Sequence, residues 1–300
     1  MPSPESQHIR QWLFQNMKNA PPPTSIQAAR EGLKLLASRV VLAPGTKVEP
    51  VVAGSVPSEW LTSPGAFPDK IVLCIHSGGY TMGTTKSVHG PGSYISAASR
   101  CRVLAINYRL APEHPFPAAI NDSVMAYRWL LEQGYVPKNI VIVGVSSGGG
   151  LTLSTLISLR DSGIALPAAA VLLSPWTDLT NSGESVTTRA DADPMITPAM
   201  NRFHSALYAG SADLRHPLIS PLFADLHGLP PLLIQVGSDE IMLDDSTRLA
   251  ERAGAAGVEV SLDVWEGMWH VWHAFAPQLP EGLQAMEQIG KYIQEKTLGA

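Results

Sequence analysis

Runs of apolar residues alternate with amphipathic segments along most of the chain. Six short runs rich in β-branched residues predict strands, and longer segments between them repeat apolar positions at helical spacing. This alternation is typical of an α/β fold with a mostly parallel sheet, covered by helices on both faces and opening with an antiparallel pair. The strands are expected at 70–76, 102–108, 139–145, 168–174, 231–237 and 258–265, the weaker antiparallel pair at 47–54 and 56–63, and the helices at 117–133, 148–161, 244–256 and 274–296.

Two segments do not follow this alternation. Residues 5–40 carry helical patterns separated by three prolines at 21–23, and residues 181–217 combine polar turns with a further helical pattern. Because functional loops lie at the carboxyl ends of parallel strands, we expect the two segments to form a lid over that edge. The alternative is that the first segment packs on the back of the sheet. Its apolar residues, which need a surface to cover, are Ile9, Trp12, Leu13, Phe14 and Met17.

Composition limits the partners that the chain can have. The 300 residues are 45% hydrophobic with a net charge of −5 and no basic cluster, which argues against nucleic acid and anionic membranes and favours a small neutral partner. No apolar run approaches the roughly 20 residues that span a bilayer, and the N-terminus lacks a signal pattern, so we expect a cytoplasmic protein. Cys74 and Cys101 lie in strand-like runs and are expected to be reduced core thiols.

The segment "GVSSG" at 144–148 follows a predicted strand and opens a predicted helix. In that context G-x-S-x-G predicts a nucleophile elbow, a sharp turn that exposes the hydroxyl of Ser146. The serine needs an imidazole base and a carboxylate, which follow it along the chain in the order acid, then histidine. Asp239 and His270 each lie just beyond a strand and are the predicted acid and base, with Asp178 as the fallback acid.

Other interpretations of these residues stay open. Asp239 could cap the following helix, although Asp244 and Asp245 are better placed for that role. His270 and His273 could form a metal pair, but no cysteine or third histidine accompanies them in the sequence, and neither metal nor organic cofactor is expected.

Acyl transfer also needs hydrogen-bond donors for the developing oxyanion. "HSGGY" follows a predicted strand, so the amides of Gly78 and Gly79 can point at one acceptor together with the amide of Ser147. A tight strand-to-loop turn alone would also explain these glycines.

Five segments resemble the bacterial esterases of the hormone-sensitive lipase family: "HSGGY", "YRLAPEHPFPAA", "GVSSGGG", "SPWTDLT", and "GSDEIMLDD" with "MWHVWH". The resemblance implies an α/β-hydrolase catalytic domain at 46–180 and 218–300, and a helical cap built from 1–45 and 181–217. It implies hydrolysis of short-chain acyl esters through an acyl-enzyme, with Ser146 as the nucleophile and no cofactor.

The resemblance is incomplete at two positions. Ser77 stands where the family has the first glycine of its oxyanion loop, and Val145 replaces an acid that can tie down that loop, a role for which the Ser77 hydroxyl is a candidate. Lactone hydrolysis and deacetylation of a small metabolite use the same triad, whereas receptors that resemble the family have lost the histidine present here at 270. The alternating last strand, 258–265, predicts an unpaired edge through which a homodimer could form.

Overall fold

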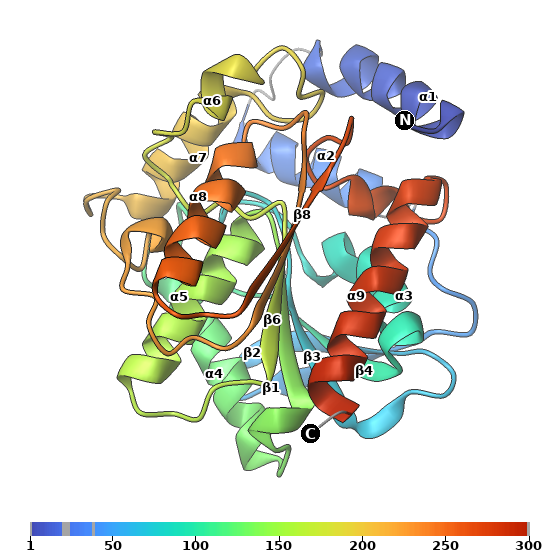
Figure 1. Cartoon of the computed structure of the whole chain (residues 1–300), viewed down its shortest axis with the longest axis vertical. Coiled ribbons are helices and arrows are strands. Elements are labelled where there is room, and N and C mark those ends of the chain that lie inside the picture. The colour runs from blue at the N-terminus through green and yellow to red at the C-terminus, as the bar shows by residue number, and fades with distance from the viewer. Residues whose placement is uncertain (1, 20–24, 38–39, 299–300) are drawn as a thin grey trace.

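One eight-stranded sheet runs through the part of the chain that the structure describes (Figure 1). The structure is a computed structural model that describes residues 2–19, 25–37 and 40–298; the prolines at 21–23 lie outside these residues. The strand order is β1-β2-β4-β3-β5-β6-β7-β8. β1 and β2 pair antiparallel, β2 joins β4 antiparallel, and every later pair is parallel. The α/β-hydrolase fold expected from the sequence is confirmed, including its antiparallel start.

The strands begin and end close to the predicted positions. They are β1 Lys47–Ala53, β2 Val56–Thr62, β3 Phe67–Ile75, β4 Cys101–Ile106, β5 Ile140–Val145, β6 Ala169–Leu173, β7 Leu232–Gly237 and β8 Val260–Trp265. The central strands β5, β6 and β7 are buried at every residue, because helices cover both of their faces. β8 lies at the edge of the sheet and is only partly buried, as its alternating pattern predicts.

Helices cover the sheet in two layers around two apolar clusters. One cluster joins the sheet to α4, α5 and α8, and the other joins it to α3 and α9. These helices are α3 His89–Ser99, α4 Ala118–Glu132, α5 Ser147–Asp161, α8 Leu243–Ala255 and α9 Pro280–Leu298, and short 3₁₀ turns lie at Thr85–Val88, Pro137–Asn139, Pro221–Phe223 and Trp272–Phe275. The last helix begins later than the predicted residue 274, because a 3₁₀ turn and a loop come before Pro280.

The sequence pattern does not predict α3. Its first residues include Gly90, Pro91 and Gly92, which disfavour a helix interior. The small residues allow close packing: a Cβ at Gly90 would lie 2.6 Å from the Val40 side chain, and one at Gly92 would lie 3.6 Å from Val103. Tertiary packing therefore overrides the weak helix propensity of this segment.

The described parts of the two segments that do not follow the alternation of strands and helices lie together at one end of the sheet (Figure 1). The first contains α1 Pro4–Leu13, a π-helical turn Phe14–Lys18 and α2 Ile26–Ala37, and the second contains α6 Ser185–Thr188 and α7 Pro198–Ala209. Lys18 Nζ joins the two segments by donating to the carbonyl oxygens of Asp193 and Ile196 at 2.9 and 3.4 Å.

The apolar face of α1 covers the loop that carries His270. Leu13 is fully buried in a cluster with Met268 and Trp269, and Ile9 packs against that cluster, whereas Trp12 is exposed. The apolar contacts of α1 are thus made with the loop after β8, and Ser3, which caps α1, bonds Glu281 at the start of α9.

Candidate active site

Ser146 occupies a strained turn between β5 and α5. Its backbone has φ 55° and ψ −119°, a conformation that costs a non-glycine residue of order 1 kcal/mol or more. A Cβ at Gly144 would lie 2.2 Å from the carbonyl oxygen of Gly148, and one at Gly148 would lie 2.3 Å from that of Ile75. Both flanking glycines are therefore required by close backbone approach, and the turn has the shape that the G-x-S-x-G motif predicts.

His270 meets Ser146 from the loop after β8. The hydroxyl of Ser146 donates to His270 Nε2 across 2.9 Å, and His270 Nδ1 donates to Glu240 Oε2 across 2.6 Å. His270 is only 3% exposed and Glu240 is fully buried. A hydroxyl, an imidazole and a carboxylate thus form one hydrogen-bonded chain shielded from water, the arrangement that activates a serine nucleophile.

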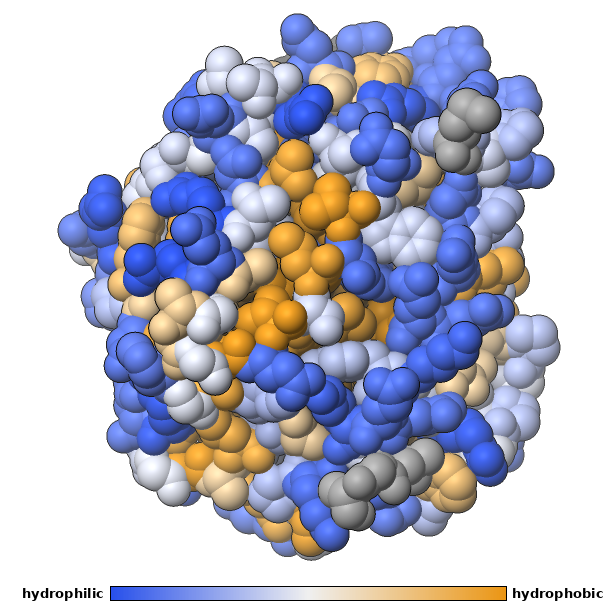
Figure 2. Space-filling model, in the orientation of Figure 1, coloured by the Kyte–Doolittle hydropathy of each residue, from blue (hydrophilic) through white to orange (hydrophobic). Residues whose placement is uncertain are grey.

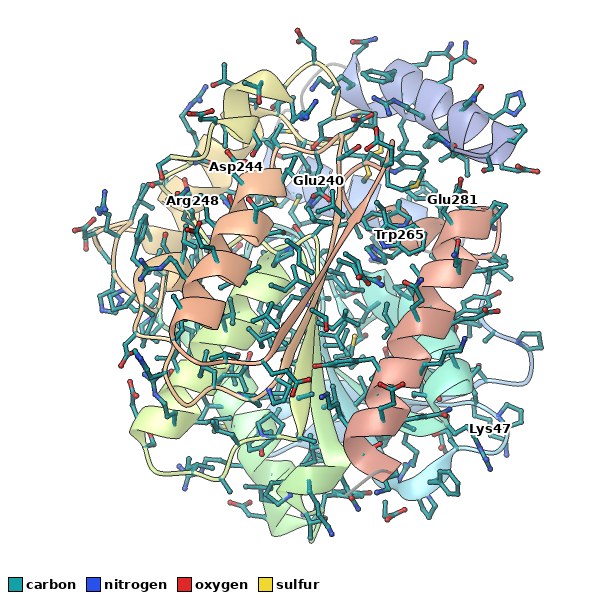
Figure 3. The ribbon with its side chains drawn as sticks, in the orientation of Figure 1. Lys47, Glu240, Asp244, Arg248, Trp265 and Glu281 are labelled. Atoms are coloured by element: carbon teal, nitrogen blue, oxygen red, sulfur yellow. The ribbon has the colours of Figure 1, made fainter. Side chains whose placement is uncertain are left out.

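The carboxylate in this chain is Glu240, so the prediction of Asp239 is wrong. Asp239 faces the other way and pairs with Arg10 of α1 across 2.5 Å. The segment "GSDE" carries two consecutive carboxylates beyond β7, and chain order alone cannot show which of them turns inward. Figure 3 labels Glu240 near the upper end of the sheet, between α8 and β8.

Two further contacts hold the second oxygen of Glu240. Oε1 accepts the amide of Gly237 at 2.6 Å and the hydroxyl of Ser174 at 2.8 Å. Ser174 Oγ also accepts the amide of Val271 at 3.1 Å, so one hydroxyl joins the acid to the loop of the base. The sequence offered a weak signal for this role, since Ser174 ends a predicted strand, but its left-handed φ of 47° appears only in the structure.

Arg10 connects α1 to both sides of this acid–base pair. Besides Asp239, it donates to the carbonyl oxygens of Gly267 at 3.3 Å and Ala192 at 2.9 Å. Asp193, the next residue, accepts the amide of Ile241 at 3.1 Å. Both segments that do not follow the alternation of strands and helices, one through Arg10 and the other through Asp193, therefore contact the loops that carry the acid and the base.

Opposing effects set the pKa of His270. Burial lowers the pKa, whereas the hydrogen bond and the charge of Glu240 raise it, with a smaller contribution from the charge of Asp193. The net result is a pKa above the ordinary value of 6.5. The imidazolium that forms during proton transfer is thus stabilised by its carboxylate partner.

The loop after β3 carries the predicted oxyanion donors. Gly78 and Gly79 have φ of 127° and 61°, and a Cβ at Gly78 would lie 2.2 Å from the carbonyl oxygen of Met82. Among the described residues the amides of Gly78, Gly79 and Ser147 donate to no protein acceptor. The contact of Gly148 with Ile75 places the start of α5 beside the start of this loop, so these three amides belong to neighbouring segments.

Neither Val145 nor Ser77, the two departures from the family pattern, places a hydrogen-bonding side chain on the loop after β3. Val145 is buried in the apolar cluster under α3 and α9. The carbonyl oxygen of Ser77 accepts His76 Nδ1 at 2.7 Å, but its hydroxyl has no hydrogen-bond partner in the described part of the chain. The Ser77 hydroxyl therefore does not replace the missing acid.

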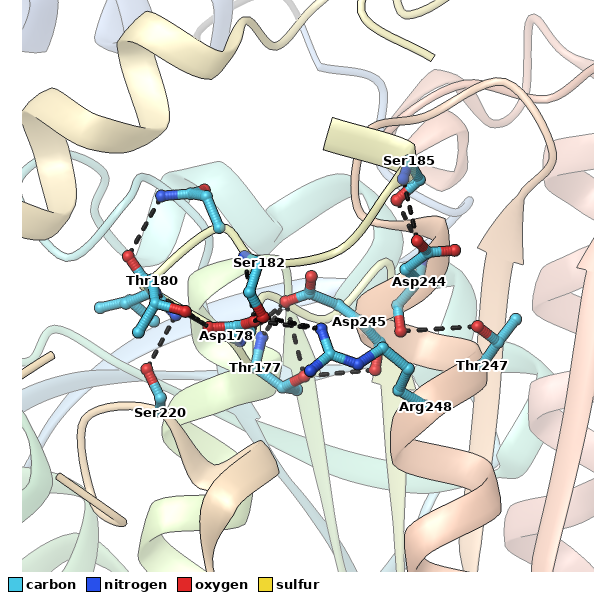
Figure 4. Close-up of polar contacts among 12 residues, drawn as sticks. Thr177, Asp178, Thr180, Ser182, Ser185, Ser220, Asp244, Asp245, Thr247 and Arg248 are labelled. Atoms are coloured by element: carbon cyan, nitrogen blue, oxygen red, sulfur yellow. Dashed lines mark hydrogen bonds and ion pairs between the residues drawn. The ribbon is translucent and has the colours of Figure 1, made fainter. Parts of the chain in front are cut away.

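The alternative residues have structural partners. His273 Nε2 lies 3.2 Å from Gln235 Oε1, and burial lowers the pKa of His273 to about 3, so the ring packs as a neutral group. Asp178 is buried among Thr180, Ser182 and Arg248, as Figure 4 shows, and has no contact with His270. Within residues 2–19, 25–37 and 40–298, no group of three or more His, Cys, Asp or Glu side chains could hold a metal ion.

The two cysteines lie in the core, as the strand-like runs around them predict. Cys74 and Cys101 are both buried free thiols, and burial raises the pKa of Cys74 to about 12. Among the described residues, no helix combines the length and the apolar character needed to cross a membrane.

Comparisons with known proteins agree with this geometry. Residues 72–274 match a family described as having the alpha/beta hydrolase fold. A solved esterase from the bacterial hormone-sensitive lipase family is 43% identical, covers 99% of each chain and superposes with a TM-score of 0.95. The chain belongs to this family. An acetyl-hydrolase of Streptomyces hygroscopicus is 40% identical over 99% of this chain and 98% of its own length, and an esterase of Acinetobacter venetianus is 34% identical over 83% and 82%.

Membership of the hormone-sensitive lipase family identifies the chain as a carboxylic ester hydrolase, as the sequence predicts. Another solved esterase, 43% identical over 99% of both chains with a TM-score of 0.92, was soaked with p-nitrophenyl butyrate.

Proposed function

We propose that the protein is a serine carboxylesterase that hydrolyses short-chain acyl esters through an acyl-enzyme. The observation that carries the proposal is the position of His270, which shares one hydrogen bond with Ser146 and another with Glu240. In this proposal Ser146 is the nucleophile, His270 the general base and Glu240 the orienting acid. The names of the related acetyl-hydrolase and esterases, and the butyrate ester used with one of them, support a short acyl group.

The reaction begins when Ser146 Oγ attacks the ester carbonyl carbon while His270 Nε2 accepts the proton of the Ser146 hydroxyl. Glu240 holds Nδ1 protonated, which leaves the lone pair of Nε2 facing the hydroxyl. The amides of Gly78, Gly79 and Ser147 donate to the oxyanion of the tetrahedral intermediate. His270 then protonates the departing alcohol, and water repeats the sequence on the acyl-serine to release the acid.

Residues 1–45 and 181–217 form a cap over the site in this proposal. Support comes from Lys18, which joins the two segments, and from Arg10, which contacts the loops of the acid and the base. A neutral ester is the expected substrate, because the chain has no basic cluster to attract an anion. The cytoplasmic location expected from the sequence stays a prediction.

A panel of substrates with a matched variant tests the proposal. Acetyl, butyryl and octanoyl p-nitrophenyl esters, a γ-lactone and an N-acetylated amine are assayed with the wild-type protein and with Ser146→Ala. We expect fastest turnover of acetyl and butyryl esters and a loss of roughly 10⁶-fold in the variant, the usual effect of removing a triad residue. Faster turnover of the lactone or the acetylated amine would show that this compound, and not an ester, represents the substrate class. Activity retained by Ser146→Ala would refute the proposed nucleophile.

A further inference from the structure

The turn that presents the proposed oxyanion donors includes one strained residue, Tyr80. Gly78, Gly79 and Tyr80 all have positive φ, with values of 127°, 61° and 62°. Two glycines adopt this conformation freely, but Tyr80 does not, so the surroundings must hold the turn in place. The Ser77 hydroxyl and Val145 do not do so, which leaves the question of what does.

One face of α7 contacts two consecutive residues of this turn. Tyr208 stacks on Tyr80 with ring centroids 3.8 Å apart, and His204 Nδ1 shares a hydrogen bond of 2.7 Å with the Thr81 hydroxyl. His204 and Tyr208 are four residues apart, so both side chains lie on the same side of the helix. A Cβ at Gly79 would lie 2.9 Å from His204 Cγ, which shows how closely α7 sits on the donor loop.

Thr81 is also held from α2. Arg30 Nε donates to the Thr81 carbonyl oxygen at 2.8 Å, while Arg30 itself is fixed by two hydrogen bonds to Glu113 of 2.7 and 2.8 Å. The Thr81 amide donates to the Gly78 carbonyl oxygen at 3.1 Å. Thr81 thus links Gly78 to α2 through its backbone and to α7 through its hydroxyl.

The contact between His204 and Thr81 joins two uncharged groups. Burial lowers the pKa of His204 to about 4, so its ring is neutral near neutral pH. Thr81 is fully buried in the loop after β3, whereas His204 lies on α7 within the segment 181–217. A change at the Thr81 hydroxyl therefore tests the connection without altering the surface that a substrate touches.

We propose that Thr81 is a positioning residue for the oxyanion hole, and that His204 and Arg30 act through it to keep the amides of Gly78 and Gly79 aimed at the substrate oxyanion. The proposal rests on the proposed function, because it assumes that these amides stabilise the transition state. It makes the donors dependent on the docking of α2 and α7, so that the cap takes part in assembling the catalytic machinery as well as covering it.

The first test compares Thr81→Val, which keeps the side-chain shape and removes the hydroxyl, with Thr81→Ser, which restores it. We expect kcat for p-nitrophenyl butyrate to fall about 10- to 100-fold in Thr81→Val, less than the loss of a whole oxyanion donor, with KM changed by less than about twofold. Thr81→Ser should recover most of kcat. Thr187→Val, at an exposed threonine of α6, is the matched control and should behave as the wild type.

His204→Phe provides a second approach if Thr81→Val does not fold. It removes the same hydrogen bond and keeps a ring on the loop, so it should lower kcat similarly. Thr81→Val also removes the 3.5 Å contact of the Thr81 hydroxyl with the Gly78 carbonyl oxygen, so the double variant should lose no more than Thr81→Val alone, in which the contact with His204 is already broken. Losses that multiply in the double variant would overturn the proposed connection.

A transition-state analogue separates positioning from general damage. A trifluoromethyl ketone adds to the serine and places an oxyanion among the same amides, so its Ki should rise in proportion to the fall in kcat/KM. The Ki of 1-butanol, which has no carbonyl group and forms no oxyanion, should stay unchanged. The positioning role is refuted if Thr81→Val is folded and keeps kcat within about twofold, or if the ketone Ki does not move.

Failure of the proposed function gives a different result. In that case the wild-type protein neither hydrolyses the ester nor binds the ketone covalently at Ser146. A wild-type protein that does both, together with an unaffected Thr81→Val variant, removes only the role of Thr81.

Discussion

At the scale of single residues, two neighbouring carboxylates bind different partners. Glu240 accepts a hydrogen bond from His270, whereas Asp239 forms an ion pair with Arg10, although both side chains belong to the same turn after β7. The motifs were enough to single out Ser146 and His270, because G-x-S-x-G puts Ser146 at the centre of the turn and His270 lies closer than His273 to the last strand. They were not enough to choose between adjacent acids, since the choice depends on Gly237 and Ser174, which bind Glu240 only after the chain has folded.

Amide substitutions at these two acids should separate their roles. Glu240→Gln should lower kcat by on the order of 10⁴-fold, because the ring of His270 is no longer held in the reactive tautomer. Asp239→Asn should lower kcat by less than about tenfold, since it weakens only a partly exposed ion pair with Arg10 that does not touch His270. Steady-state rates with p-nitrophenyl butyrate measure both effects. The reverse order of damage would return the role of the acid to Asp239.

The pH dependence of turnover should report the pKa of His270. The base must be neutral to accept a proton, and its pKa lies above 6.5 because Glu240 more than offsets the effect of burial. We therefore expect kcat/KM to fall as the pH decreases through a value above 6.5. In Glu240→Gln the remaining activity should fall at a lower pH, because the charge that raises the pKa is gone. An unchanged midpoint would argue against this coupling.

At the scale of secondary-structure elements, the sheet was predictable and parts of its covering were not. Central strands leave short apolar runs rich in β-branched residues, and the edge strand β8 leaves an alternating pattern, so all eight strands were found within a few residues. α3 was missed because its glycines and proline serve close packing against Val40 and Val103, a reason that no local pattern reveals. The same limit applies to the contact between His204 and Thr81, which joins residues 123 positions apart.

Removal of residues 1–40 should separate the chemistry from substrate turnover. The truncated protein loses Arg10 and Arg30 and uncovers the cluster around Trp269, so we expect ester turnover to fall by about 100-fold or more. Ser146 stays on the sheet and should still react with a small phosphonylating reagent. Mass spectrometry of the labelled peptide and circular dichroism measure the two outcomes, with the full chain as the control.

Aggregation or unfolding of the truncated protein would contradict this expectation. It would mean that α1 and α2 contribute core packing that the sheet cannot lose, and that the cap boundary near residue 45 is wrong.

At the scale of the whole molecule, β8 leaves one edge of the sheet unpaired within the described chain. In the view of Figure 2, hydrophobic surface runs along the middle of the molecule, over β8. On this strand Val264 is 47% exposed, and Val260 and Leu262 are half-buried. An edge strand with an apolar face invites pairing with a second copy about a twofold axis. We therefore propose a homodimer through β8.

Light scattering at micromolar concentration measures the expected dimer. The wild-type protein should have twice the mass of one chain, and Val264→Lys should shift it toward the monomer, because a charge on an edge strand opposes pairing. Exposed Val52 lies on β1 at the opposite edge, so Val52→Lys is the matched control and should leave the dimer intact. A wild-type monomer, or a dimer that only Val52→Lys disrupts, would exclude the β8 interface.

The three hydrogen bonds of Arg10 also have a consequence for heat inactivation. In α1 only Ser6 and Leu13 are buried, and an element with few buried residues opens at a lower free energy than the sheet. When α1 opens, Asp239 and Gly267 lose their common partner, and the turn that holds Glu240 loses its outer support. On slow heating, esterase activity should therefore disappear several degrees before the circular dichroism of the sheet changes, and it should return on cooling from that interval. Working temperature would then be set by one terminal helix, while the sheet beneath it remains folded.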